Sequence, residues 1–197
     1  AVAAAELGWE VTLLLGPVSN PIASRERLSV HAFRTCEDLR ALIASHAAAS
    51  DVLIMAAAVA DYRPKPNPLI SGGKFRRTEG TVTLVLESTP DLLAEAARSR
   101  RPDQLFVGFA LEPREDLLDS AHRKLARKRI DLVVANPLET MDSETVEAVI
   151  VSADGERLDT PGIMTKASFA PWLLEQVDAR LRALVNHSGR ASISAAA

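Results

Sequence analysis

"VLIMAAAVADYRP" (residues 52–64) is the stretch of sequence from which the fold can be worked out. An apolar run over residues 52–60 ends abruptly in Asp61, Tyr62 and Arg63. A continuous apolar run is typical of a strand that is buried on both faces of a parallel sheet. Ligands of such sheets bind beyond the carboxyl ends of the strands. We therefore expect residues 52–60 to form an internal strand and Asp61 to lie at the rim of a binding crevice.

On both sides of this stretch, short apolar runs alternate with segments of helical periodicity. Strands are predicted at residues 11–15, 29–33, 82–87, 105–112, 131–136 and 146–151. Helices are predicted at residues 1–8, 36–49, 89–100, 114–129 and 165–185. This alternation requires crossover connections between parallel strands. The predicted fold class is therefore α/β, a Rossmann-like, doubly wound and mainly parallel sheet with helices on both faces.

The segment 63–80 interrupts the alternation, because it is rich in proline and glycine. We expect it to form an irregular arm. The rest of the chain predicts one domain over residues 1–186, followed by a disordered tail over 187–197. The first residues read as the body of a helix with neither a Met nor a capping residue before them, so we expect further sequence upstream.

Composition excludes several classes of function. The 197 residues are 47 % apolar and 25 % charged, with a formal net charge of −3. A global positive field for nucleic acid is therefore absent. No apolar run approaches the roughly 18 residues that a membrane span needs. The single Cys36 excludes an intrachain disulfide, and no H-E-x-x-H or C-x-x-C spacing suggests zinc.

Two groups of cationic side chains are candidates for phosphate binding. Lys74 lies in "GGKFRR" (residues 72–77), which could close over a polyphosphate. Lys124 and Lys128 are four residues apart and so share one face of a predicted helix. The ordinary interpretation of each group is a solvated charged surface. The alternative is a set of point charges around a triphosphate.

The sequence "STPDLL" (residues 88–93) could start a helix, with Thr89 as its cap and Pro90 in the first turn. Capping is the ordinary interpretation of Thr89 and Asp91. A helix amino terminus can also bind an anion or the edge of a base if a ligand reaches it. The sequence leaves both interpretations open.

Taken together, these segments resemble the phosphopantothenoylcysteine synthetase family. "AAAVADYRP", "KFRR", "TPDLL", "VGFALE" and "KLARKRIDLVVAN" occur here in the family's order, and the resemblance extends from residue 1 to about residue 180. It implies a ligase that activates the carboxylate of 4′-phosphopantothenate with CTP, forms an acyl-cytidylate and transfers the acyl group to cysteine. It also implies Mg²⁺, a homodimer, a cytoplasmic location and no FMN in this domain. A phosphopantothenoylcysteine decarboxylase would be fused to the chain or act as its partner.

The resemblance also assigns roles to residues. Lys74 matches the first lysine of the family's Lys-x-Lys-Lys arm and would be catalytic. Ala57 and Ala58 resemble positions that contact phosphopantothenate. The residues that resemble nucleotide-binding positions are Asp61, Thr89, Pro90, Asp91, Phe109, Lys124 and Lys128. The family's upstream strand, with its Asn-x-Ser-Ser-Gly loop, has no counterpart in these residues.

Two other hypotheses are compatible with the sequence. A non-catalytic relative would keep the nucleotide-binding fold without turnover, as the absent loop and the arginines at 76 and 77 would allow. An NAD(P)-dependent oxidoreductase is disfavoured because no G-x-G-x-x-G fingerprint is visible. The preference between CTP and ATP stays open.

Overall fold

The computed structural model describes residues 1–65, 81 and 83–194, with side chains described as far as residue 186. The chain divides into two units. The larger one comprises Ala1–Ala57 and Leu92–Ala197, and the smaller one comprises Ala58–Asp91. Each unit is described here by itself.

The larger unit is built around a five-stranded sheet with the order β10-β9-β7-β6-β3. Its strands are β3 (Val52–Met55), β6 (Leu105–Glu112), β7 (Leu132–Pro137), β9 (Val149–Ser152) and β10 (Arg157–Asp159). β3, β6 and β7 are parallel, whereas β9 and β10 are antiparallel to their neighbours. Two further pairs are β1 (Val11–Leu15) with β2 (Leu28–Ala32), which are parallel, and β8 (Thr145–Val146) with β11 (Met164–Thr165), which are antiparallel.

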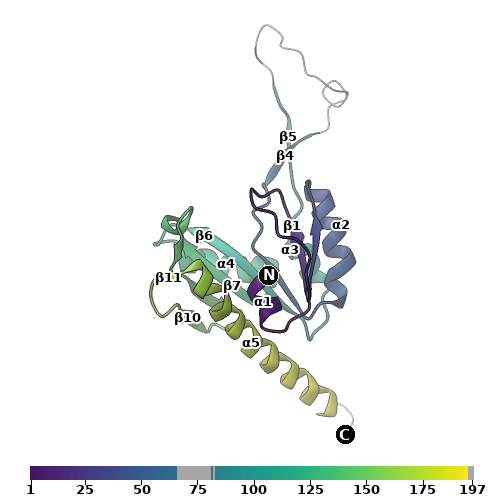
Figure 1. Ribbon diagram of the computed structural model, residues 1–197, viewed down its shortest axis with the longest axis vertical. Coiled ribbons are helices and arrows are strands. Elements are labelled where there is room, and N and C mark those ends of the chain that lie inside the picture. Colours follow the sequence, from purple (N-terminus) through teal and green to yellow (C-terminus); the bar gives the residue numbers. More distant parts are fainter. Residues whose placement is uncertain (66–80, 82, 195–197) are drawn as a thin grey trace. The chain divides into compact units, whose positions relative to one another are not determined.

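Helices cover both faces of this sheet. On one face, Leu93 and Ala97 of α3 (Leu92–Arg98) and Leu125 of α4 (Leu117–Lys128) pack with Val133 and Ala135 of β7. The other face is covered by α5 (Lys166–Ser194), the long helix that ends at the C-terminus in Figure 1. Its apolar side chains pack with Leu132 and Val134, which alternate with Val133 and Ala135 along β7. The predicted α/β class with a mainly parallel sheet is therefore confirmed.

The remaining helices are α1 (Val2–Glu6) and α2 (Cys36–His46), with 3-10 turns at Ala47–Ala49 and Leu138–Thr140. The start of α2 follows directly from its sequence. The Thr35 hydroxyl accepts the Asp38 N–H at 3.1 Å, and the Asp38 carboxylate accepts the Thr35 N–H at 2.9 Å. This reciprocal capping box makes Thr35 the helix cap, and α2 begins at Cys36, where the sequence predicted a helix to start.

The smaller unit contains an antiparallel ribbon of β4 (Tyr62–Pro64) and β5 (Leu86–Ser88). Arg63 and Glu87 are paired across the ribbon and form an ion pair at 2.9 Å. The start of the expected irregular arm, residues 63–64, is therefore a strand. Residues 66–80 and 82, which include Lys74, lie outside the described residues.

Several predicted boundaries are wrong. The strand predicted at 52–60 ends at Met55, and it is only partly buried because β3 lies at the margin of its sheet. Of the strand predicted at 82–87, residues 83–85 are irregular and residue 82 is not described, whereas β5 spans Leu86–Ser88. α5 continues through Ser194, so the helix enters the segment expected to be a tail, of which residues 195–197 are not described.

Thr89 does not act as the helix cap that the sequence suggested. α3 begins at Leu92, three residues later. The Thr89 N–H donates to the Asp61 carbonyl at 2.9 Å, and the Thr89 hydroxyl donates to the Ala60 carbonyl. A hydroxyl engaged with the opposite segment of the chain is not available as a cap for α3.

Candidate functional site

The carboxyl ends of β3 and β6 form a step at one edge of the sheet. Met55, the last residue of β3, pairs with Gly108, whereas β6 continues to Glu112. The Leu105 N–H donates to the carbonyl of Asp51, the residue just before β3. Backbone groups of alternate residues point to the same edge of a strand, so those of Leu105, Val107 and Phe109 point toward β3. The carbonyl of Phe109 therefore points into the space beyond the end of β3.

Lys124 fills part of this space. Its ammonium group donates a hydrogen bond to the Phe109 carbonyl at 2.6 Å, and its side chain is partly buried. α4 carries Lys128 one turn further along, also partly buried. The structure thus brings together Phe109 and Lys124, which are 15 residues apart in the sequence. A cation held at the carboxyl edge of a parallel sheet is placed to meet an anionic ligand.

Ala57 lies at the same edge. It follows β3 closely and lines a cavity together with residues of β1, α2 and β3. Its small side chain leaves the backbone accessible to a ligand, which is compatible with the substrate-contact role that the resemblance implied. Ala58 belongs to the smaller unit, so the two alanines fall on either side of the division.

The smaller unit brings a second set of predicted residues together. The hydrogen bond from the Thr89 N–H to the Asp61 carbonyl joins the ends of the two ribbon segments. Asp61 is exposed, and Pro90 and Asp91 follow Thr89 directly. Asp61 belongs to the smaller unit, whereas Lys124 and Lys128 belong to the larger one. The convergence of these three side chains on one ligand stays a prediction. The predicted role of Lys74 falls outside the described residues.

Asn136 is a further candidate residue at the carboxyl edge of the sheet. Its amide oxygen is buried and has no hydrogen-bond partner among the described residues. A buried polar atom without a partner costs roughly 1–3 kcal/mol, so it calls for an explanation such as a bound ligand. Asn136 lies near the carboxyl end of β7, opposite Leu111 of β6. In the sequence, the feature that indicates this residue is its polar side chain at the end of the apolar run "LVVAN".

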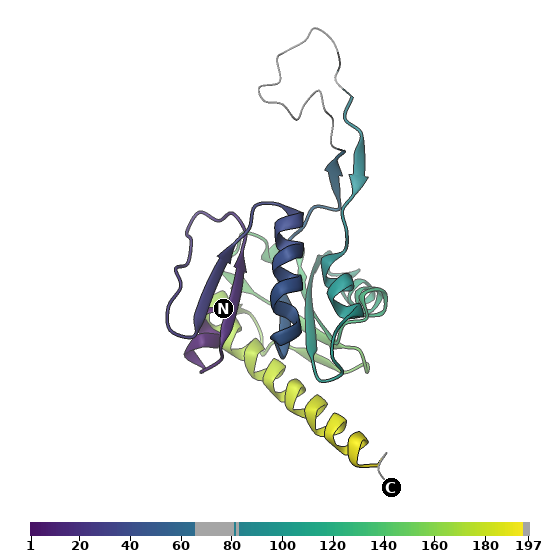
Figure 2. The same ribbon diagram turned by 90° about the vertical axis from the view of Figure 1, so that its right-hand side faces the viewer.

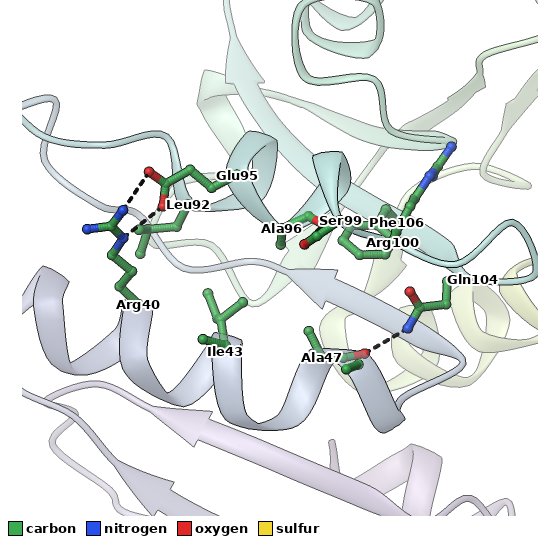
Figure 3. A pocket seen from close by; sticks show the side chains of 12 residues that line it. Arg40, Ile43, Ala47, Leu92, Glu95, Ala96, Ser99, Arg100, Gln104 and Phe106 are labelled. Atoms are coloured by element: carbon green, nitrogen blue, oxygen red, sulfur yellow. Dashed lines mark hydrogen bonds and ion pairs between the residues drawn. The ribbon is translucent and has the colours of Figure 1, made fainter.

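The cavity in Figure 3 is less suited to chemistry. It has a volume of about 290 Å³ and lies between α2 and α3. Arg40 donates two hydrogen bonds to Glu95, at 2.9 and 3.1 Å, and the Gln104 amide donates to the Ala47 carbonyl at 2.7 Å. The side chains of Arg40, Glu95 and Gln104 are thus engaged with partners within the protein. Phe106 lines it near the amino end of β6, and no predicted site residue of the described part does so.

In residues 1–65, 81 and 83–194, no three His, Cys, Asp or Glu side chains gather in a way that could hold a metal ion. In the same residues, no helix combines the length and the hydropathy needed to cross a bilayer.

Comparisons with known proteins extend these observations. A family model described as "DNA/pantothenate metabolism flavoprotein C-terminal domain" matches residues 1–181. The coenzyme A biosynthesis bifunctional protein CoaBC of Bacillus subtilis (strain 168) is 35 % identical over 185 residues, which cover 91 % of this chain and 43 % of the relative. A cysteine/cysteine sulfinic acid decarboxylase from an unknown prokaryotic organism is 38 % identical over 136 residues, covering 69 % of this chain and 36 % of the relative. The chain therefore spans less than half the length of either protein.

Among solved structures, the C-terminal domain of a coenzyme A biosynthesis bifunctional protein CoaBC superposes with a TM-score of 0.70. Its sequence identity is 27 %, and the match covers 91 % of this chain and 78 % of that one. The solved domain thus contains residues without a counterpart here. The family resemblance found in the sequence is confirmed by these matches.

Proposed function

Because the chain belongs to the family of DNA/pantothenate metabolism flavoprotein C-terminal domains, we propose that it joins 4′-phosphopantothenate to cysteine in coenzyme A biosynthesis. The similarity to CoaBC proteins in sequence and in structure supports a ligase of this pathway. CTP would supply the energy through an acyl-cytidylate.

The proposed reaction has two steps. A carboxylate oxygen of phosphopantothenate attacks the α-phosphorus of CTP, a P–O bond forms, and the bond to pyrophosphate breaks. The neutral amine of cysteine then attacks the acyl carbon, an amide bond forms, and CMP leaves while the nitrogen loses a proton to solvent. Both steps need cations where negative charge develops and exclusion of water from the acyl intermediate.

The hydrogen bond between Lys124 and the Phe109 carbonyl is the observation that carries this proposal. It holds one ammonium at the carboxyl edge of the sheet, near the backbone that follows β3. We assign Lys124 and Lys128 to the triphosphate, and Asp61 with Thr89, Pro90 and Asp91 to the nucleoside. Ala57 and Ala58 would contact phosphopantothenate, and Lys74 would act near the reacting phosphorus.

We also propose that Mg²⁺ is bound chiefly through the triphosphate of CTP. The described residues gather no set of metal ligands of their own, and Mg²⁺ is commonly held by substrate phosphates with one or two carboxylates. When bound, it would neutralise phosphate charge. A cytoplasmic homodimer, with a decarboxylase fused or associated and no FMN in this domain, completes the proposal.

The nucleotide part of the proposal can be tested by calorimetry. The chain is titrated with CTP, ATP and NAD, alongside a Lys124→Ala variant and an Arg127→Ala control from the exposed side of the same helix. We expect CTP to bind and Lys124→Ala to weaken binding about tenfold or more, which corresponds to about 1.4 kcal/mol. Arg127→Ala should change the affinity less than about twofold. Equal CTP affinity for all three proteins would contradict the assigned site, and preferential binding of NAD would favour an oxidoreductase.

Turnover is tested with the protein that includes any upstream sequence. We expect release of pyrophosphate from CTP only when phosphopantothenate is present. Lys74→Ala should reduce formation of the acyl-cytidylate about 100-fold, as expected when a group that stabilises the transition state is lost. Undiminished turnover in that variant would remove Lys74 from the reaction. Binding of CTP without any turnover would identify a non-catalytic relative.

A further inference from the structure

Side chains from successive turns of α4 form hydrogen bonds with the carboxyl end of β6. The Ser120 hydroxyl donates to the Glu112 Oε1 atom at 2.7 Å, and the Lys124 ammonium donates to the Phe109 carbonyl at 2.6 Å. Ser120 and Lys124 are four residues apart, so they lie on the same face of the helix, about one turn from each other. The first bond therefore joins β6 to the turn of α4 that precedes Lys124.

Glu112 is directed toward α4 by its place in the strand. It is the last residue of β6 and is partly buried. Side chains alternate between the two faces of a strand, so Glu112 shares a face with Phe106 and Ala110. Those two residues pack in one apolar cluster with Ala121 of α4. The Glu112 carboxylate thus meets α4 at the carboxyl edge of the sheet, where the candidate site lies.

Ser120 does not bond in the way that is ordinary for a serine inside a helix. Such a hydroxyl commonly donates to the carbonyl four residues earlier in the same helix. Ser45 does so in α2, the dark blue helix at the centre of Figure 2, where its hydroxyl donates to the Ala41 carbonyl at 2.9 Å. Ser120 is only 9 % exposed and donates to a carboxylate on a strand instead. Its hydrogen bond therefore ties one element to another.

This bond supplies a restraint that the apolar contacts of α4 lack. Leu117, Ala121 and Leu125 pack toward the sheet, and the free energy of burying such side chains is non-directional. A hydrogen bond, in contrast, weakens steeply when the distance or the angle between donor and acceptor changes. The bond between Ser120 and Glu112 therefore opposes sliding and rotation of α4 relative to β6.

The position of α4 matters for Lys124 because of the chemistry of lysine. A lysine ammonium is a point charge on a flexible four-carbon stem, so its place depends on the helix backbone and on a local acceptor. The Phe109 carbonyl is such an acceptor. A misplacement of about 1 Å can reduce the rate of an enzyme reaction about 100-fold. A bond that fixes the preceding turn of α4 can thus affect a ligand that it does not touch.

We propose that Ser120 and Glu112 are positioning residues for triphosphate binding. Their hydrogen bond holds the turn of α4 from which Lys124 reaches the carboxyl edge, so the ammonium is in place before a nucleotide arrives. The identity of the ligand rests on the proposed function, whereas the position of the ammonium is a property of the ligand-free protein. The acceptor oxygen of Glu112 matters here and its charge does not, because a serine hydroxyl can donate equally well to the oxygen of an amide.

The first test follows the carbonyl carbon of Phe109 by NMR in the ligand-free 197-residue chain. Lys124→Ala gives the chemical shift of this carbon without the ammonium. Ser120→Ala should move the shift toward that value, whereas Ser45→Ala, which removes a bond within α2, should not change it. Glu112→Gln should stay close to wild type, since its amide oxygen can accept the hydroxyl. An unchanged shift in Ser120→Ala would overturn the proposal, and so would an equal change in Glu112→Gln.

The second test measures CTP affinity by calorimetry in wild type, Ser120→Ala, Lys124→Ala and the double variant. Ser120→Ala should weaken binding about fivefold when Lys124 is present and less than about 1.5-fold when it is absent, because residues that act through one group are not additive. Equal losses in both backgrounds would overturn the proposal, since a general effect on the fold does not depend on Lys124.

The two tests also separate this proposal from the proposed function. If Lys124→Ala binds CTP as wild type does, the nucleotide site of the proposed function is wrong, and the role of Ser120 and Glu112 in triphosphate binding is overturned with it. The shift of the Phe109 carbonyl carbon still decides whether the pair positions Lys124, because that measurement involves no nucleotide. A changed carbonyl shift together with a non-additive loss of affinity supports both proposals.

Discussion

The middle and the margin of the larger sheet differ in how deeply their side chains are buried, although the sequences of their strands are of the same kind. Val107 of β6 and Val133 of β7 are completely buried, whereas Ile54 of β3 is 38 % exposed. All three lie in mainly apolar strands. The middle of the sheet has paired neighbours on both sides and a helix on each face, whereas β3 is paired on one side only among the described residues and borders a cavity that β1 also lines. An apolar run therefore specifies the environment in which a strand is stable, and the neighbouring elements decide whether that environment exists.

The largest expected effect compares the same substitution in the two regions. Leu132→Ala in β7 should lower the free energy of unfolding by about 2–5 kcal/mol, because a side chain that is only 3 % exposed leaves a closed cavity. Leu14→Ala in β1 should cost about 1 kcal/mol, since that side chain already borders open space. Urea unfolding of both variants provides the measurement. Equal losses would show that β1 is as tightly enclosed as β7.

A smaller effect tests how tightly the middle of the sheet is packed. A Cβ atom at Gly108 would lie 2.9 Å from the Ile130 Cδ1 atom and 3.1 Å from the Leu93 Cδ2 atom. Gly108→Ala should therefore destabilise the protein by about 1–3 kcal/mol through overpacking. Adding Ile130→Val removes the closer methyl group and should make the double variant less unstable than additivity predicts. Strictly additive losses in thermal or urea unfolding would exclude this contact as the cause.

The next prediction concerns the Asn136 amide at the carboxyl edge of the sheet. If its unpartnered oxygen serves a ligand, Asn136→Leu should leave the unfolding free energy within about 1 kcal/mol of wild type, because it removes a buried polar group that has no partner. The same variant should weaken CTP or phosphopantothenate binding about fivefold, since the Asn136 oxygen would accept a hydrogen bond from a neutral O–H or N–H group of the ligand, and such a bond is worth about 1 kcal/mol. Calorimetry and urea unfolding distinguish the two effects. Unchanged affinity for both ligands would leave Asn136 without a binding role.

The smallest expected effect lies at the antiparallel margin of the sheet. Hydrogen bonds from Ser152 and then Arg180 lower the pKa of Asp154 from 3.8 to about 2. A lowered folded-state pKa means that the stabilisation is present above pH 4 and is lost as the pH falls through about 2. Since this carboxylate is half exposed, Asp154→Asn should cost less than about 1 kcal/mol at pH 6, with no difference from wild type near pH 2. Urea unfolding across this pH range provides the check, and a pH-independent difference would contradict the assignment.

Local patterns predicted those features that depend on neighbours in the sequence. The start of the helix at Cys36 is one example, because the hydrogen bonds between Thr35 and Asp38 that cap it close within three residues. The limits of Leu105–Glu112 are another, because that strand is buried and its apolar run is uninterrupted. Predictions were wrong where a segment distant in the sequence provides the hydrogen-bond partner. The Thr89 hydroxyl donates to the Ala60 carbonyl across the ribbon instead of capping α3. The residues next to Thr89 in the sequence do not indicate this hydrogen bond.

The sequence by itself determined the α/β class, the approximate order of its elements and the family, because these follow from hydrophobic period and from motif order. The tertiary structure decided that the Lys124 ammonium binds the Phe109 carbonyl, that the Asn136 oxygen is buried, and that β1 and β3 face an open cavity. The physical reason is that periodicity records which face of an element is apolar. Hydrogen bonds and burial at the carboxyl edge depend on where each strand ends relative to its neighbour, and only the folded chain fixes that register.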